Sequence, residues 1–284
     1  MYRAAGDLTL DGTALSRRLM EAVAAAARGG GPPAVLATAL ACMAELEYGS
    51  GRWPQAHAAA AESLALAESL RPPGAGDRAL GYPLSTIALI EAGLGREDEC
   101  RAHADRVLAG PHDGDIAAVV HAEAARGLLA LARADHPTAL SHLDAVAALS
   151  GARGTLAFAL GRWGADHVEA AAGTGEHDRA VRLLERLSAY ATAVRVPGLD
   201  ALTLRAAGVV AGEADMDLLF QEALEMDADR PNPADRARTR LCYAERLEGC
   251  GRPGEAAGHR AAALRTFEEI GARVWAARCR PVAA

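Results

Sequence analysis

The chain has 284 residues, of which 51% are hydrophobic but only 4% aromatic, and its formal net charge is −7. All 30 basic residues are arginine, so the chain lacks the lysine that a Walker P-loop, a Schiff-base enzyme or a protein kinase uses. An acidic chain without a basic stripe is also a poor candidate for direct binding to nucleic acid.

The remaining composition indicates a cytoplasmic protein. No signal peptide and no run of 18 apolar residues is present, so we expect neither export nor a membrane span. The cysteines are odd in number and none has CxxC spacing, which favours buried, reduced thiols. The use of arginine alone as a basic residue suggests a GC-rich coding sequence, as in actinobacteria. The five cysteines are Cys42, Cys100, Cys242, Cys250 and Cys279.

One turn pattern recurs along the chain about every 40 residues: a short break, then a helix whose fourth to sixth residue is small. Such a period indicates a repeat architecture in which each unit is a pair of helices joined by a tight turn. A further turn near Gly212 is degenerate. The five clear turns begin at Gly51, Gly95, Ala134, Gly175 and Gly251.

The pattern predicts six pairs of helices. The first helices of the pairs are expected over 33–48, 78–93, 115–133, 154–172, 198–211 and 233–249. The second helices are expected over 53–70, 97–109, 137–149, 177–194, 214–227 and 254–270. Two further helices, 12–28 and 272–280, would act as end caps. Pro54, Pro137 and Pro253 support these boundaries, because proline is tolerated at a helix start.

These elements predict a single all-α domain over 1–284, a TPR-like α-solenoid of about six antiparallel helix pairs with end caps. Residues 1–11 are expected to be disordered or extended, and 272–284 to form a C-terminal cap and tail. The helices are longer than in the standard 34-residue TPR motif.

The last repeat resembles the final TPR repeat of the large ATP-binding LuxR-type transcriptional regulators, the group that includes the maltose-regulon activator. The resemblance covers 230–276, and beyond it only helix pattern and repeat length agree. Asn232 replaces the family's aromatic residue and Ala244 its glycine. The matching residues are Arg230, Pro231, Ala237, Arg238, Thr239, Leu241, Tyr243, Glu245, Leu247, Phe267, Gly271, Ala272, Trp275 and Ala276.

In that family the repeats lie between an ATPase and a helix-turn-helix domain, and are thought to sense inducers or partners. The missing lysine excludes the ATPase, and only nine residues follow Trp275. The resemblance therefore implies either an excised sensor region or a free-standing protein of the same descent. Arg238, Tyr243 and Trp275 are expected to pack the end of the array.

The first helix of each pair would line a concave groove. On 154–172, Arg162 and Asp166 share one face, as do Trp163 and His167, because each pair is four residues apart. Tyr82, His121 and Arg205 occupy comparable positions on other first helices. Together these seven residues could bind an aromatic, anionic small molecule or an acidic peptide, although packing or solvated pairing explains each one singly at least as well.

Two functions remain open from the sequence. The favoured one is a non-catalytic module that binds a small-molecule effector or a protein in the groove. We expect it to use no cofactor or metal and to bind neither a membrane nor nucleic acid directly. The sequence leaves open whether the chain forms a homodimer. The rival is a free-standing biosynthetic enzyme with His121 or His167 as acid or base, which requires a closed pocket. No metal-binding or nucleophile motif is present, so no catalytic residue is assigned.

Overall fold

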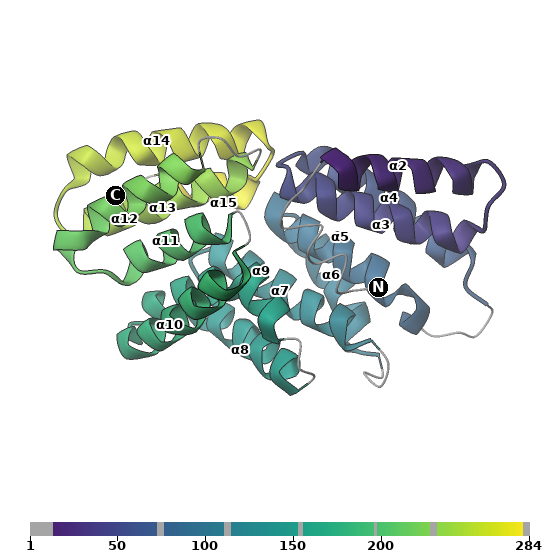
Figure 1. The fold of residues 1–284 in the computed structure, drawn as a ribbon, viewed down its shortest axis with the longest axis horizontal. Helices are drawn as coiled ribbons and strands as arrows, with labels where there is room; N and C mark the ends of the chain where they lie inside the picture. The colour runs from purple at the N-terminus through teal and green to yellow at the C-terminus, as the bar shows by residue number, and fades with distance from the viewer. Residues whose placement is uncertain are drawn as a thin grey trace. The chain divides into compact units, whose positions relative to one another are not determined.

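The structure, a computed structural model, describes residues 14–72, 77–110, 115–152, 156–195, 198–227 and 232–280. These segments form α-helices α2 to α15 and one 3-10 turn, η1 (Asp77–Leu80), and contain no strand (Figure 1). The chain divides into two compact units, Met1–Leu129 and Ala130–Ala284, and the division falls within α7. Residues 1–11, expected to be disordered or extended, lie outside the described residues.

The first unit consists of helices that pack against their neighbours in the chain. The central contacts are α2 with α3, α3 with α4, α4 with α5 and α5 with α6. Helix α5 is buried along almost its whole length, as its mainly apolar sequence favours. The helices are α2 (Ala14–Arg28), α3 (Pro33–Gly49), α4 (Trp53–Ser69), α5 (Gly81–Leu94), α6 (Glu97–Leu108) and the larger part of α7 (Ile116–Ala132).

The second unit is organised around α9, which contacts α8, α10 and α11. Residues 163–170 of α9 are all buried. A hairpin of α13 and α14 follows, and α15 packs on α14 (Figure 1). The helices are α8 (His136–Ala152), α9 (Leu156–Gly173), α10 (His177–Val194), α11 (Leu199–Val210), α12 (Glu213–Met226), α13 (Pro233–Gly249), α14 (Pro253–Glu269) and α15 (Arg273–Arg278).

The predicted helices are confirmed to within a few residues, and all five predicted turns share one backbone geometry. The first turn residue has a positive φ, between 57° and 82°, and the next residue donates its N–H to the carbonyl five residues earlier. This is the Schellman motif, which ends a helix and satisfies its last carbonyls. The bonds are Arg52 to Glu47 (2.9 Å), Arg96 to Glu91 (2.8 Å), Asp135 to Ala130 (2.9 Å), Glu176 to Ala171 (3.1 Å) and Arg252 to Leu247 (2.9 Å).

The sequence pattern did not mark a sixth turn of this kind, between α14 and α15. Gly271 has a φ of 78°, and Ala272 donates to the carbonyl of Phe267 at 2.8 Å. The degenerate turn behaves differently, because Gly212 has an extended backbone (φ −65°, ψ 165°). Helices α11 and α12 are therefore joined by another connection, which explains why the repeat pattern weakens there.

The five cysteines are free, and Cys100, Cys242 and Cys279 are buried as expected, whereas Cys42 and Cys250 are half-buried. Burial raises the pKa of the Cys100 thiol to about 12 and that of Cys279 to about 11, so both are protonated at neutral pH. Among the described residues, no helix is both long and apolar enough to cross a membrane.

Candidate functional site

Two of the seven groove residues predicted from the sequence, Tyr82 and His121, belong to the first unit. The Tyr82 hydroxyl lies 3.5 Å from the Cys42 sulfur, and burial is the main cause of the raised pKa of this tyrosine. His121 is buried in α7, with 4% of its surface exposed. Both residues therefore contribute mainly to the interior of the unit.

Three others lie on α9: Trp163 and His167 in its buried stretch, and the half-buried Arg162 directly before it. Trp163 is 4% exposed, and the Arg162 guanidinium lies 5.8 Å from its ring centroid. Nε2 of His167 lies 2.9 Å from Oδ1 of Asp144 on α8, and Arg179 of α10 contacts the same carboxylate. Burial lowers the pKa of His167, so the ring is neutral at pH 7 and bridges α9 to α8.

The remaining two, Asp166 and Arg205, come together in a buried ion-pair network. Asp166 Oδ1 lies 3.4 Å from Nη2 of Arg205 on α11 and 2.6 Å from Nη1 of Arg238 on α13. The exposed fractions of these side chains are at most 9%, so the charges are shielded from water. The sequence placed Asp166 and Arg205 on one groove surface, and the structure shows them paired with each other.

The network continues to the C-terminal helix. Arg238 Nη2 donates to Glu169 at 2.7 Å, and Arg278 of α15 reaches the other oxygen of Glu169 at 3.1 Å. Arg278 also binds both carboxylate oxygens of Glu245 and donates to the Leu131 carbonyl at 2.6 Å. The Trp275 ring lies against both guanidinium groups, with centroid distances of 4.8 Å to Arg238 and 5.5 Å to Arg278. This buried ion-pair network thus joins α9, α11, α13 and α15.

Glu169 is ionised within this network. Burial alone would raise its pKa, but the positive charges of Arg238, Arg278 and Arg205 lower it to about 2. A carboxyl group whose pKa is lower in the folded than in the unfolded state stabilises the fold above its unfolded pKa. That stabilisation is lost as the pH falls from the ordinary glutamate value of 4.5 towards 2.

We therefore expect Glu169→Gln to lower the free energy of unfolding by about 3 kcal/mol at pH 7. The difference between variant and parent should shrink as the pH falls from about 5 to 2, because the parent carboxylate becomes protonated in the same window. Urea unfolding at a series of pH values measures both effects. The exposed Glu222→Gln is the control and should change stability little at any pH; a pH-independent loss in Glu169→Gln contradicts this assignment.

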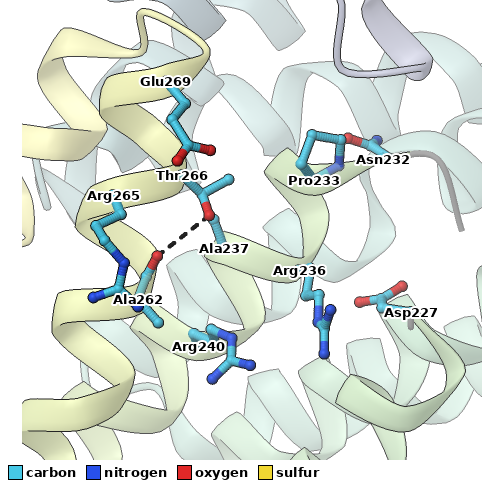
Figure 2. A pocket seen from close by; sticks show the side chains of 10 residues that line it. All are labelled: Asp227, Asn232, Pro233, Arg236, Ala237, Arg240, Ala262, Arg265, Thr266 and Glu269. Carbon is cyan, nitrogen blue, oxygen red and sulfur yellow. Dashed lines mark hydrogen bonds between the residues drawn. The ribbon is translucent and has the colours of Figure 1, made fainter. Parts of the chain in front are cut away.

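Three arginines outside this network gather around a cavity of about 330 Å³ on the α13–α14 hairpin (Figure 2). Arg236 and Arg240 are one turn apart on α13, and Arg265 approaches from α14. The other lining residues are Asp227, Asn232, Pro233, Ala237, Ala262, Thr266 and Glu269. We call this site the arginine pocket.

The three arginines of this pocket are not neutralised by the described part of the chain. None of them has a hydrogen bond or an ion pair to any residue that the structure describes, and Nε of Arg236 is buried without a partner there. Burial, followed by the repulsion of Arg236 and Arg265, lowers the pKa of Arg240. By contrast, Arg179, Arg252 and Arg278 each contact at least two carboxylates. The pocket therefore offers unpaired positive charge to an anion.

Two acidic side chains limit but do not cancel this charge. Asp227, at the end of α12, is 4% exposed, and Glu269 is exposed at the other end of the pocket. Asn232 caps α13 through its own Oδ1, which accepts from Ala234 at 3.1 Å. The sequence interpretation missed this site, although the spacing of Arg236 and Arg240 was a usable signal. The site also requires α14 to pack against α13, which places Arg265 at the same cavity.

A second cavity, of about 420 Å³, is open and mostly apolar. It lies on α10, α11 and α12, and no predicted groove residue lines it. Its lining residues are His177, Val181, Leu184, Ala207, Val210, Ala211, Asp215, Leu218 and Leu219. It offers little charge or hydrogen bonding to fix a ligand's orientation.

Within the described segments, no group of three or more His, Cys, Asp and Glu side chains is placed to hold a metal ion. No model of a known protein family matches the chain, and a search of curated proteins finds no significant relative. The arginine pocket itself is therefore the feature of the described residues that points to a function.

Proposed function

We propose that this chain is a non-catalytic ligand-binding module that takes an anionic molecule into the arginine pocket. One observation carries the proposal: Arg236, Arg240 and Arg265 line one cavity, and no carboxylate of the described chain pairs with them. Like charges held together without an ion pair to neutralise each of them destabilise a fold. Such an arrangement is expected where binding requires it, because function and stability compete at binding sites.

We also propose that the helices form a TPR-like α-solenoid, in which ligands bind on surfaces formed by successive helices. The repeated Schellman turns support this interpretation, because they end helices at corresponding points of five predicted repeats. The described segments are all helical, which is consistent with it.

A relationship to the sensor region of LuxR-type regulators is also part of the proposal. Several residues that carry the resemblance act together in packing, since Arg238, Glu245 and Trp275 belong to the buried ion-pair network or pack on it. Matching residues that pack together support a relationship between two proteins better than the same number of matches scattered along the chain. We therefore propose a sensor that binds its effector on α13 and α14, on the same helix α13 that contributes Arg238 to the buried ion-pair network.

The experiment is thermal unfolding of the full chain in a dilute, phosphate-free buffer, with inorganic phosphate or citrate as the probe. A ligand that binds only the folded state raises the Tm in a saturable way. We expect such a rise for the parent and for Arg182→Gln, which removes an exposed arginine of α10. Arg240→Gln should lose most of it.

An equal rise in all three proteins would indicate the general salting effect of these anions and would contradict a specific site. No rise in the parent would contradict the proposal as well.

A further inference from the structure

We infer that the ligand of the arginine pocket is a phosphate monoester of a small hydroxylated molecule, such as a sugar phosphate. This inference rests on the proposed function, that the pocket binds an anion. It names the chemical class of that anion from the charge, the size and the lining of the cavity.

The charge of the pocket favours phosphate over a single carboxylate. Three arginines from two helices line the cavity, with Arg236 and Arg240 on one face of α13 and Arg265 on α14. A carboxylate carries one charge and is satisfied by one bidentate arginine. A phosphate monoester carries about −1.5 to −2 at pH 7 and presents three acceptor oxygens. It can therefore engage several arginines at once.

The size of the cavity leaves room for more than the phosphate group. Its volume of about 330 Å³ is roughly ten times the ~30 Å³ share of a water molecule in the liquid. It lies at the small end of the range for ligand pockets, about 300–1,000 Å³. A phosphate with a compact organic group fits this volume better than inorganic phosphate alone.

The lining indicates what that organic group is. None of the ten lining residues is aromatic, so the pocket offers no stacking surface for a nucleobase. At one edge of the pocket the exposed Glu269 presents a carboxylate, which accepts hydrogen bonds from hydroxyl groups. The Thr266 hydroxyl donates to the Ala262 carbonyl at 3.2 Å and keeps lone pairs for a further bond. A polyhydroxyl group matches these acceptors.

The inference is tested by calorimetric titration of the full chain with glucose 6-phosphate, glycerol 3-phosphate, inorganic phosphate, gluconate, glucose and AMP. We expect at least one of the two organic phosphates to bind saturably at one site. Its Kd should be about 10-fold or more below those of gluconate and inorganic phosphate, because a charge-assisted contact is worth about 1.5–3 kcal/mol. Glucose should not bind, and the adenine base of AMP should not lower its Kd below that of the sugar phosphates.

The outcomes separate this inference from the proposed function. Gluconate or inorganic phosphate binding as tightly as the sugar phosphates would overturn the ligand class and leave an anion-binding module. AMP binding most tightly would overturn the hydroxylated group in the same way. If no anion binds, both fail. If a sugar phosphate binds as expected, Arg236→Gln and Arg240→Gln should each weaken its binding about 10-fold or more, while Arg182→Gln should not.

Discussion

Arg238→Met should lower the free energy of unfolding by about 3–5 kcal/mol, the usual range for breaking a buried ion pair from one side. The substitution leaves Asp166 and Glu169 without the guanidinium that now lies 2.6 Å and 2.7 Å from them. Both carboxylates are buried, so water cannot replace the lost partner.

The matched control is Arg240→Met, two residues further along the same helix. Arg240 has no acidic partner in the described chain and is repelled by Arg236 and Arg265. Its removal should therefore change stability by less than about 0.5 kcal/mol, as for most surface positions. Urea unfolding followed by circular dichroism measures both variants. Equal losses at the two positions would contradict the division of α13 into a structural and a ligand-binding face.

Trp275→Ala should lower the free energy of unfolding by about 3–5 kcal/mol, in the range for truncating a buried aromatic residue. Trp275 is 1% exposed, stacks on Phe267 at 5.7 Å between centroids, and covers the guanidinium groups of Arg238 and Arg278. Its removal opens a cavity and exposes the buried ion-pair network to water. The cation–π contacts are lost as well.

Trp275→Phe is the control for this prediction, because it keeps a ring in place with a smaller volume. We expect it to lose clearly less stability than the alanine variant in the same urea experiment. If Trp275→Ala loses less than about 1 kcal/mol, then α15 is not held by this network, and the packing role inferred for the motif residue Trp275 is wrong.

The helices and turns could be predicted from the sequence because their signals are local. A glycine after an apolar helix, followed by proline or acidic residues, specifies a Schellman turn and the next helix start within a few residues. Ala134 shows the limit of the rule, since a non-glycine residue adopts the same left-handed backbone with a φ of 57°. The repeat spacing was informative there, although the residue type was not.

The roles of the charged residues could not be predicted in the same way. The spacing of Arg162 and Asp166 suggested a pair on one helix face, but Asp166 is bound by arginines 39 and 72 residues further along the chain. Sequence spacing does not report such distant contacts. Equally, Arg236, Arg238 and Arg240 alternate on α13, and only the packing of α9 and α14 shows which of them are neutralised.

The most direct test of the central claim is a calorimetric titration with a sugar phosphate that compares the parent with the triple variant Arg236→Gln, Arg240→Gln and Arg265→Gln. No described ion pair is broken by these three changes, so the variant should fold with a Tm close to that of the parent. If the arginine pocket is the binding site, we expect saturable binding at one site in the parent and none in the variant. Equal affinity in both proteins, or no binding of any anion by the parent, would contradict it.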